Sequence, residues 1–129
     1  MNIGEVSERT GLPAKTIRYY EEIGLVRPDR DANGYRRFDG QHLHKLAFLG
    51  RARSLGFSIE DCRTLLALWE DRERASQDVK AVAERHLAEI DAKMAELAAM
   101  RATLSDLVRR CAGDRRPDCP ILSDLADPG

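Results

Sequence analysis

Two cysteines near the end of the sequence, Cys111 and Cys119, are the residues best suited to chemistry. Gly113 and Pro117 lie between them and Pro120 follows directly, so the segment favours a tight loop that keeps both thiols close together. Thiolates are soft ligands that select soft metals such as Cu(I). Zinc sites normally take three or four protein ligands, whereas this loop offers two cysteines and no histidine. The pair therefore suits linear coordination of a monovalent ion: Cu(I), Ag(I) or Au(I).

Two other interpretations of this pair remain open. A reversible Cys111–Cys119 disulfide would make a thiol-redox sensor, since the nearby Arg115 and Arg116 would lower thiol pKa values. Alternatively, the two thiols are structural and unrelated. An iron–sulfur cluster usually needs four cysteines, and the third cysteine, Cys62, is expected in the core of a helical domain.

The charge distribution points to the N-terminal part as a binding region. The formal net charge is −1, but residues 1–57 hold 10 lysines and arginines against 7 acidic residues, and residues 58–129 hold 11 against 15. A basic N-terminal part is compatible with nucleic-acid binding. Neither a membrane span nor a signal peptide is recognisable, which predicts a cytoplasmic protein. We expect no enzyme, because no nucleophile–base pair, phosphate-binding glycine loop or carboxylate pair is recognisable.

The first 24 residues have the outline of a helix-turn-helix. Asn2 is a competent N-cap, and Gly11 is suited to end the first helix. Pro13 is suited to the first turn of a second helix, over residues 14–22, which ends before Gly24. That helix turns Ile17 inward and offers outward the groups that can reach phosphates and base edges, Lys15, Arg18 and Tyr19.

A hairpin is expected to follow the helix-turn-helix. Asn33-Gly34 between extended flanks is a strong hairpin signal, because both residues tolerate positive φ. A hairpin that carries Arg36 and Arg37 directly after a helix-turn-helix is interpreted as a DNA-binding wing. The alternative is an ordinary solvent-exposed hairpin.

Two further helices are expected. One covers about residues 40–55 after the N-cap Asp39, and the other runs from the capping residue Ser58 to about Trp69. The inward face of the first is predicted to consist of Leu43, Leu46, Ala47, Leu49 and Gly50.

The most regular stretch runs from Ser76, expected as N-cap, to Arg110. It contains no glycine or proline and would span roughly 50 Å as a helix. Apolar residues recur along it with coiled-coil spacing, broken once by Arg101: Ala83, Leu87, Ile90, Met94, Leu97, Leu104 and Val108. Such a stripe predicts a dimerisation helix; the alternative is a helix folded back on the N-terminal half.

The segments MNIGEVSERTGLPAKTIRYYEEIGLVRP, NGYRRF and RARSLGFSIED together resemble the N-terminal domain of the MerR family of transcriptional regulators. The resemblance covers residues 1–70 and extends to that family's antiparallel coiled-coil dimerisation helix. The tail, with Cys119-Pro-Ile eight residues after Cys111, resembles the copper-responsive, CueR- and HmrR-type branch, in which two such cysteines bind a monovalent metal.

This resemblance implies a mainly α-helical homodimer with a winged helix-turn-helix domain, which binds promoter DNA with and without metal. It further implies that metal binding distorts the DNA and so activates RNA polymerase at metal-efflux genes. Arg18, Tyr19 and Arg36 match DNA contacts of the family. Three other residues match positions that buttress or touch the DNA backbone: Tyr20, Tyr35 and Arg53.

The expected organisation is a DNA-binding domain over residues 1–70, a linker and dimerisation helix over 71–110, and a metal-binding loop with a short helix over 111–129. In an antiparallel dimer, Ser76 and Lys80 of one helix would lie near the cysteine loop of the other subunit. They are therefore predicted to surround the metal ligands.

Overall fold

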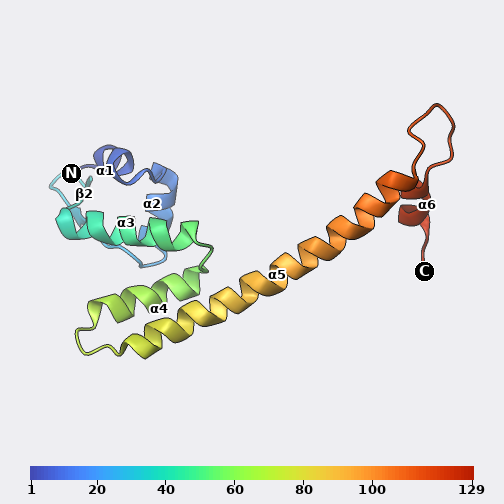
Figure 1. The fold of residues 1–129 in the computed structure, drawn as a ribbon. Helices are drawn as coiled ribbons and strands as arrows, with labels where there is room; N and C mark the ends of the chain where they lie inside the picture. The colour runs from blue at the N-terminus through green and yellow to red at the C-terminus, as the bar shows by residue number, and fades with distance from the viewer. The chain divides into compact units, whose positions relative to one another are not determined.

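The structure is a computed structural model that describes residues 1–129, and it divides into two compact units, Met1–Val82 and Ala83–Gly129. The elements, in chain order, are α1 (Ile3–Thr10), α2 (Ala14–Glu22), β1 (Asp29–Arg30), β2 (Arg36–Arg37), α3 (Gly40–Ser54), α4 (Ile59–Glu70), α5 (Ser76–Arg110) and α6 (Pro120–Ala126) (Figure 1). The chain is thus mainly helical, as predicted, and its only sheet is the two-stranded hairpin. No helix combines the length and the apolar character that crossing a membrane requires.

The helix-turn-helix forms where the capping residues indicate. The Asn2 side chain accepts a hydrogen bond from the Glu5 N–H at 2.9 Å, and Gly11 ends α1 with a φ of 74°. Pro13 is not in the first turn of α2 but is its N-cap, and its carbonyl accepts from the Ile17 N–H at 3.1 Å. Pro13 cannot donate a backbone hydrogen bond, so it is tolerated here without loss.

The predicted hairpin is present, and Asp31 stabilises its turn. Asp31 accepts at its backbone carbonyl from the Gly34 N–H, and at its carboxylate from the N–H groups of Asn33 and Tyr35. Gly34 has a positive φ of 81°, whereas Asn33 does not adopt the positive φ that it tolerates. The Asp31 carboxylate satisfies the turn's N–H groups, which allows Asn33 to keep an ordinary backbone conformation.

The core of the first unit lies where α3 packs against α1 and α4 (Figure 1). Leu46 and Leu49 of α3 are fully buried, as expected, but Ala47 is exposed and Ala52 is buried instead. The inward face of α3 therefore continues from Leu49 to Ala52, one turn later, and excludes Ala47. Cys62 of α4 is fully buried among these apolar side chains, which confirms its structural role.

Gly50 lies at a close contact between α3 and Leu12. A Cβ atom at this position would lie 3.3 Å from a methyl group of Leu12, tighter than almost all real contacts of this kind. The absence of a side chain lets α3 approach the turn of the helix-turn-helix closely.

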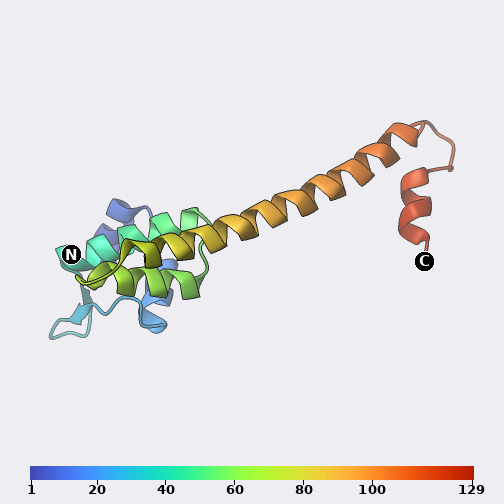
Figure 2. The ribbon, with the colours of Figure 1, turned by 60° about the horizontal axis from the view of Figure 1, so that its bottom comes forward.

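In the second unit, the C-terminal part of α5 is followed by a loop that turns the chain back, and then by α6 (Figure 2). Helix α5 itself begins at Ser76, so Ser76 is its first residue and not its N-cap. The predicted apolar stripe is exposed over its length: Ala83 is exposed, and the larger side chains Leu87, Ile90, Met94, Leu97, Leu104 and Val108 are between 37% and 62% exposed. Met100, which was not part of the prediction, is also exposed. One chain alone leaves this stripe accessible to a partner.

Replacing a core leucine should test the assignment of the inner face of α3. We expect Leu46→Ala to lower the free energy of unfolding by about 2–5 kcal/mol, because it leaves a cavity in a close-packed core. The measurement is urea unfolding of the metal-free protein at fixed protein concentration. Ala47→Ser on the exposed face of the same helix is the control and should change that value by less than about 0.5 kcal/mol. Equal effects of the two substitutions would contradict the assignment.

Candidate metal site and nucleic-acid interface

The two loop cysteines lie close together at the end of α5. The Cys111 N–H donates to the carbonyls of Leu107 and Val108, so this thiol is fixed to the last turn of the long helix. Cys119 is the N-cap residue of α6, and its carbonyl accepts from the Ser123 N–H. The two Sγ atoms are 3.9 Å apart, both side chains are half-buried, and both thiols are free. Cys111 and Cys119, eight positions apart in sequence, thus place two sulfur atoms side by side.

The surroundings of Cys119 favour its thiolate form. Backbone N–H groups at the start of α6, Leu122 first and then Ile121, lower the pKa of the Cys119 thiol, and the Cys111 side chain adds to this effect. Partial burial opposes it. The thiolate is the form that binds metal, so this shift favours the form of Cys119 that the predicted metal site would need.

The loop arginines have a different role from the one suggested by the sequence. Arg116 pairs with the Asp114 carboxylate at 2.8 Å, and the Arg116 N–H also donates to Asp114. The lowered pKa of Cys119 comes from hydrogen bonds with backbone groups and Cys111, not from Arg115 or Arg116. The charge of Arg116 is thus largely engaged within the loop.

The donor set fits a soft monovalent ion better than a harder divalent one. Nowhere in the chain do three or more His, Cys, Asp or Glu side chains gather to hold a metal ion. Within one chain, the site consists of two thiols and nothing else that binds metal strongly. Two sulfur donors satisfy a soft, two-coordinate ion, whereas zinc would need further ligands.

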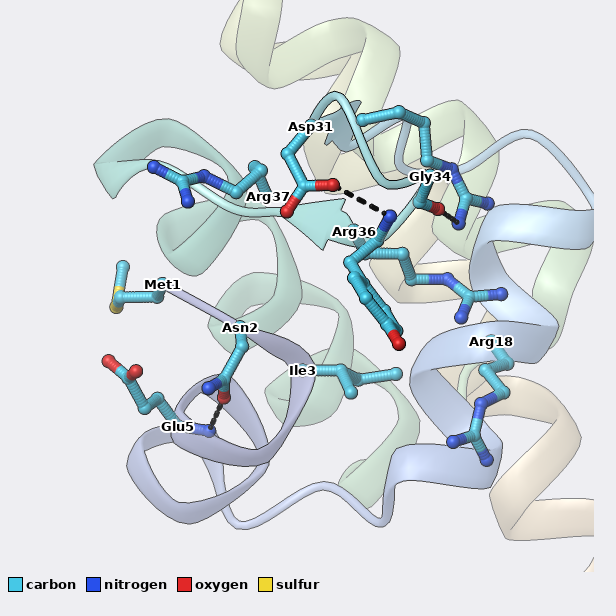
Figure 3. A pocket seen from close by; sticks show the side chains of 11 residues that line it. Met1, Asn2, Ile3, Glu5, Arg18, Asp31, Gly34, Arg36 and Arg37 are labelled. Atoms are coloured by element: carbon cyan, nitrogen blue, oxygen red, sulfur yellow. Dashed lines mark hydrogen bonds between the residues drawn. The ribbon is translucent and has the colours of Figure 1, made fainter.

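The candidate DNA-binding face combines α2 with the hairpin. Arg18 of α2 and Arg36 of the hairpin line the same groove of about 850 Å³, together with Arg30 and Arg37 (Figure 3). On α2, Lys15 and Arg18 are exposed, and Tyr19 is 45% exposed. The structure therefore brings Arg18 of α2 and the hairpin arginines into one basic surface of the first unit, as a winged helix requires.

Sequence reasoning missed Glu21 of α2, which links α2 to the hairpin. Its carboxylate accepts from the Arg30 guanidinium at 2.5 Å and, through its other oxygen, from Arg36. An acidic residue one turn after Arg18 on a helix with a basic outer face was the available signal. The partners are 9 and 15 residues away in sequence, so spacing alone could not identify them.

The three predicted buttressing residues lie in different surroundings. Tyr20 is only 3% exposed and belongs to the core; burial raises the pKa of its hydroxyl, and the nearby Arg53 guanidinium opposes that shift. Arg53 also donates to the Phe57 carbonyl at 2.6 Å. Tyr35 is 71% exposed on the hairpin. Tyr20 is thus placed to support α2 from within, whereas Tyr35 is free to touch a ligand.

The two residues predicted around the metal ligands, Ser76 and Lys80, lie in the first two turns of α5. Both are exposed. Asp78 lies in the first turn, as expected, where the helix dipole favours a negative charge.

A helix-turn-helix with a basic hairpin, joined to a long helix, defines a class of protein: a DNA-binding transcriptional regulator. The chain belongs to the MerR family of transcriptional regulators. The family "MerR HTH family regulatory protein" matches residues 1–69, and the family "MerR, DNA binding" matches residues 43–107. This confirms the family resemblance and the winged-helix prediction. It also agrees with the prediction that the protein is a regulator and not an enzyme.

Several relatives align over nearly the whole chain. The chain is 61% identical to the HTH-type transcriptional regulator HmrR of Rhizobium leguminosarum bv. viciae, over 98% of both chains. It is 45% identical to the HTH-type transcriptional regulator CueR of Salmonella typhimurium, over 98% of this chain and 92% of CueR. Among solved structures, the transcription regulator PbrR691 from Ralstonia metallidurans CH34 in complex with lead(II) superposes with a TM-score of 0.84 at 35% identity, over 98% of this chain and 99% of PbrR691.

The lowered pKa of Cys119 leads to a test with Cys119 as the only loop thiol, in which its alkylation is followed separately from that of the buried Cys62 by peptide mass spectrometry. In a Cys111→Ser variant, we expect the alkylation rate of Cys119 by iodoacetamide to rise with pH through a midpoint below the ordinary thiol value of about 8.5. The backbone N–H groups of α6, the main cause, remain in this variant. Unfolding the same variant in guanidinium should return the midpoint to the ordinary value. A folded midpoint at or above that of the unfolded chain would contradict the proposed hydrogen bonds.

Proposed function

We propose that this protein is a Cu(I)-responsive transcriptional activator, which also accepts Ag(I) or Au(I), and that it controls metal-efflux genes from the cytoplasm. The observation that carries the proposal is the pair of free thiols 3.9 Å apart, without other clustered donors, at the end of α5. Full-length similarity to HmrR and CueR supports a metal-responsive regulator of this kind. The two-thiol donor set supports a monovalent ion over a divalent one.

The proposed mechanism uses α5 as the link between sensing and DNA binding. Two chains pair through the exposed apolar stripe of α5 in antiparallel orientation, which brings Ser76 and Lys80 of one chain near the cysteine loop of the other. Cys111 and Cys119 would hold the metal ion at the end of α5, and a change in this loop would pass along α5 to the relative placement of the two DNA-binding domains. The bound promoter is thereby distorted so that RNA polymerase can use it.

In this proposal, Arg18, Lys15 and Tyr19 of α2 and Arg36 of the hairpin contact the promoter directly. Tyr35 and Arg53 touch the DNA backbone, and Tyr20 supports α2 from the core. Basic and hydroxyl groups of this kind bind phosphates and the acceptor edges of bases.

A thiol-redox regulator is the second candidate, because the same Sγ···Sγ distance places the two thiols within reach of disulfide formation after a small movement. Oxidation would join the sulfurs, release two protons and transfer two electrons to an external thiol oxidant such as a small disulfide. In this reading the loop responds to the oxidant, not to a metal.

The two candidates separate in an anaerobic transcription assay with the reduced protein and parallel titrations of Cu(I), Ag(I), Au(I) and Zn(II). We expect activation by the monovalent ions and none by Zn(II). Activation by a mild oxidant but not by Cu(I) would rule out the metal proposal and favour the redox regulator.

Serine variants locate the response in the loop. We expect Cys111→Ser and Cys119→Ser to abolish activation by Cu(I) while promoter affinity stays within about twofold, since the thiols lie outside the DNA-binding unit. Cys62→Ser is the matched control at a thiol outside the loop and should keep the metal response if the variant folds. Full Cu(I)-dependent transcription by either loop variant would refute a two-ligand site.

Alanine variants test the DNA contacts. We expect Arg18→Ala and Arg36→Ala each to weaken promoter binding by about 1–3 kcal/mol, measured by fluorescence anisotropy over a range of salt concentrations. Arg72→Ala, which removes the same charge from the exposed segment after α4, is the control and should have little effect. Unchanged affinity in both Arg18→Ala and Arg36→Ala would refute the proposed contacts.

A further inference from the structure

Glu21 of α2 forms ion pairs with the hairpin, one to each strand. Arg30 of β1 donates to one carboxylate oxygen and Arg36 of β2 donates to the other. Hydrogen bonds between guanidinium and carboxylate groups are among the stronger and more directional interactions at a protein surface. Glu21 therefore connects the helix that carries Arg18 to each strand of the hairpin.

The two pairs are partly shielded from water. The side chain of Glu21 is 19% exposed and that of Arg36 is 26% exposed, whereas the side chain of Arg30 is 46% exposed. Ion pairs that are fully exposed contribute little to structure, but shielding makes the Glu21–Arg36 pair less sensitive to solvent and salt. Arg36 thus has a defined position before it meets any ligand.

The hairpin has few other attachments that could orient it. Its strands have two residues each, and a hairpin this small is at best marginally stable by itself. Its base is held by Phe38, which is buried and whose N–H donates to the Met1 carbonyl at 2.8 Å. Towards the tip, Tyr35 is largely exposed. Beyond the base, the Glu21 pairs are the direct polar links from the strands to α2.

We propose that Glu21 is a positioning residue for DNA recognition, which sets the placement of Arg36 and Arg30 relative to Arg18 without touching the DNA itself. The inference rests on the proposed contact between Arg36 and DNA. The three-residue cluster keeps a net charge of +1, so it still attracts phosphate. Fixing the arginines in advance reduces the conformational entropy lost when the DNA binds.

Removing the charge of Glu21 and removing its positioning effect are expected to change DNA affinity in opposite directions. Glu21→Gln removes a negative charge next to a DNA-binding surface, so electrostatics alone predict tighter binding to every duplex. Loss of positioning predicts weaker binding to the operator only. We expect operator affinity to fall about tenfold, within the range of coupling between contacting residues, with no fall in affinity for unrelated DNA.

The probes are an operator duplex, selected by the wild-type protein from a random-sequence pool, and a scrambled duplex of the same composition. The full-length, reduced, metal-free protein is titrated into each duplex. Glu22→Gln is the matched control: it makes the same charge change on the next residue, whose side chain is exposed and forms no ion pair with the hairpin. Glu22→Gln should leave the ratio of operator to scrambled affinity unchanged.

Glu21→Asp is the second variant, because it keeps the charge and withdraws the carboxylate by one methylene group. A positioning role predicts a lower operator affinity for this variant too, since the shorter side chain cannot reach both arginines. Circular dichroism and thermal unfolding establish that each variant is folded. Wild-type operator affinity of Glu21→Asp, or unchanged or increased operator affinity of Glu21→Gln, would overturn the inference.

A double-mutant cycle shows whether Glu21 acts through the arginines. In an Arg30→Ala, Arg36→Ala background, adding Glu21→Gln should cause no further loss of operator affinity. A further tenfold loss would mean that Glu21 acts on the DNA or on α2 directly and would overturn the inference. If Arg36→Ala and Arg30→Ala leave operator affinity unchanged while Arg18→Ala weakens it, DNA binding through α2 stands and the inference fails.

Discussion

The exposed apolar stripe of α5 is the constraint on which the rest of the structure depends. A helix of 35 residues carries large apolar side chains along one side, and a single chain leaves most of them accessible to water. Burying a large apolar side chain contributes about 1.5–3 kcal/mol relative to exposure, so pairing with a second chain is strongly favoured. In the proposed antiparallel dimer, this pairing would determine which part of one chain lies beside the cysteine loop of the other.

The cysteine loop shows how a small site can be prepared by backbone groups. The turn of α5 that ends at Arg110 fixes Cys111, and the N–H groups at the start of α6 lower the pKa of Cys119. Arginines in the loop looked like the natural source of that shift, but Arg116 is paired with Asp114. Because backbone N–H groups lower the pKa of the Cys119 thiol, that pKa depends on the loop conformation more than on the charges of the loop side chains.

In the DNA-binding unit, a side chain and not the backbone prepares the functional groups. Its core, around Leu46, Leu49 and Cys62, holds α3 and α4 under the helix-turn-helix. The hairpin lies at the margin of this core and is joined to α2 by Glu21. A basic surface thus contains an acidic residue whose contribution is the placement of its neighbours, in a position where its charge by itself would weaken DNA binding.

The sequence by itself determined where the helices lie, the family and the candidate thiol pair, because these depend on local signals; only the capping roles of Pro13 and Ser76 differ from those expected. Asn2 and Gly11 delimit α1 through caps within four residues, and the absence of glycine and proline from Ser76 to Arg110 leaves α5 uninterrupted. Other features were decided by tertiary structure: burial of Ala52 in place of Ala47, and the pairing of Glu21 with Arg30 and Arg36. Each of these results from packing or hydrogen bonding between groups that local propensity does not bring together, so only the folded chain could show them.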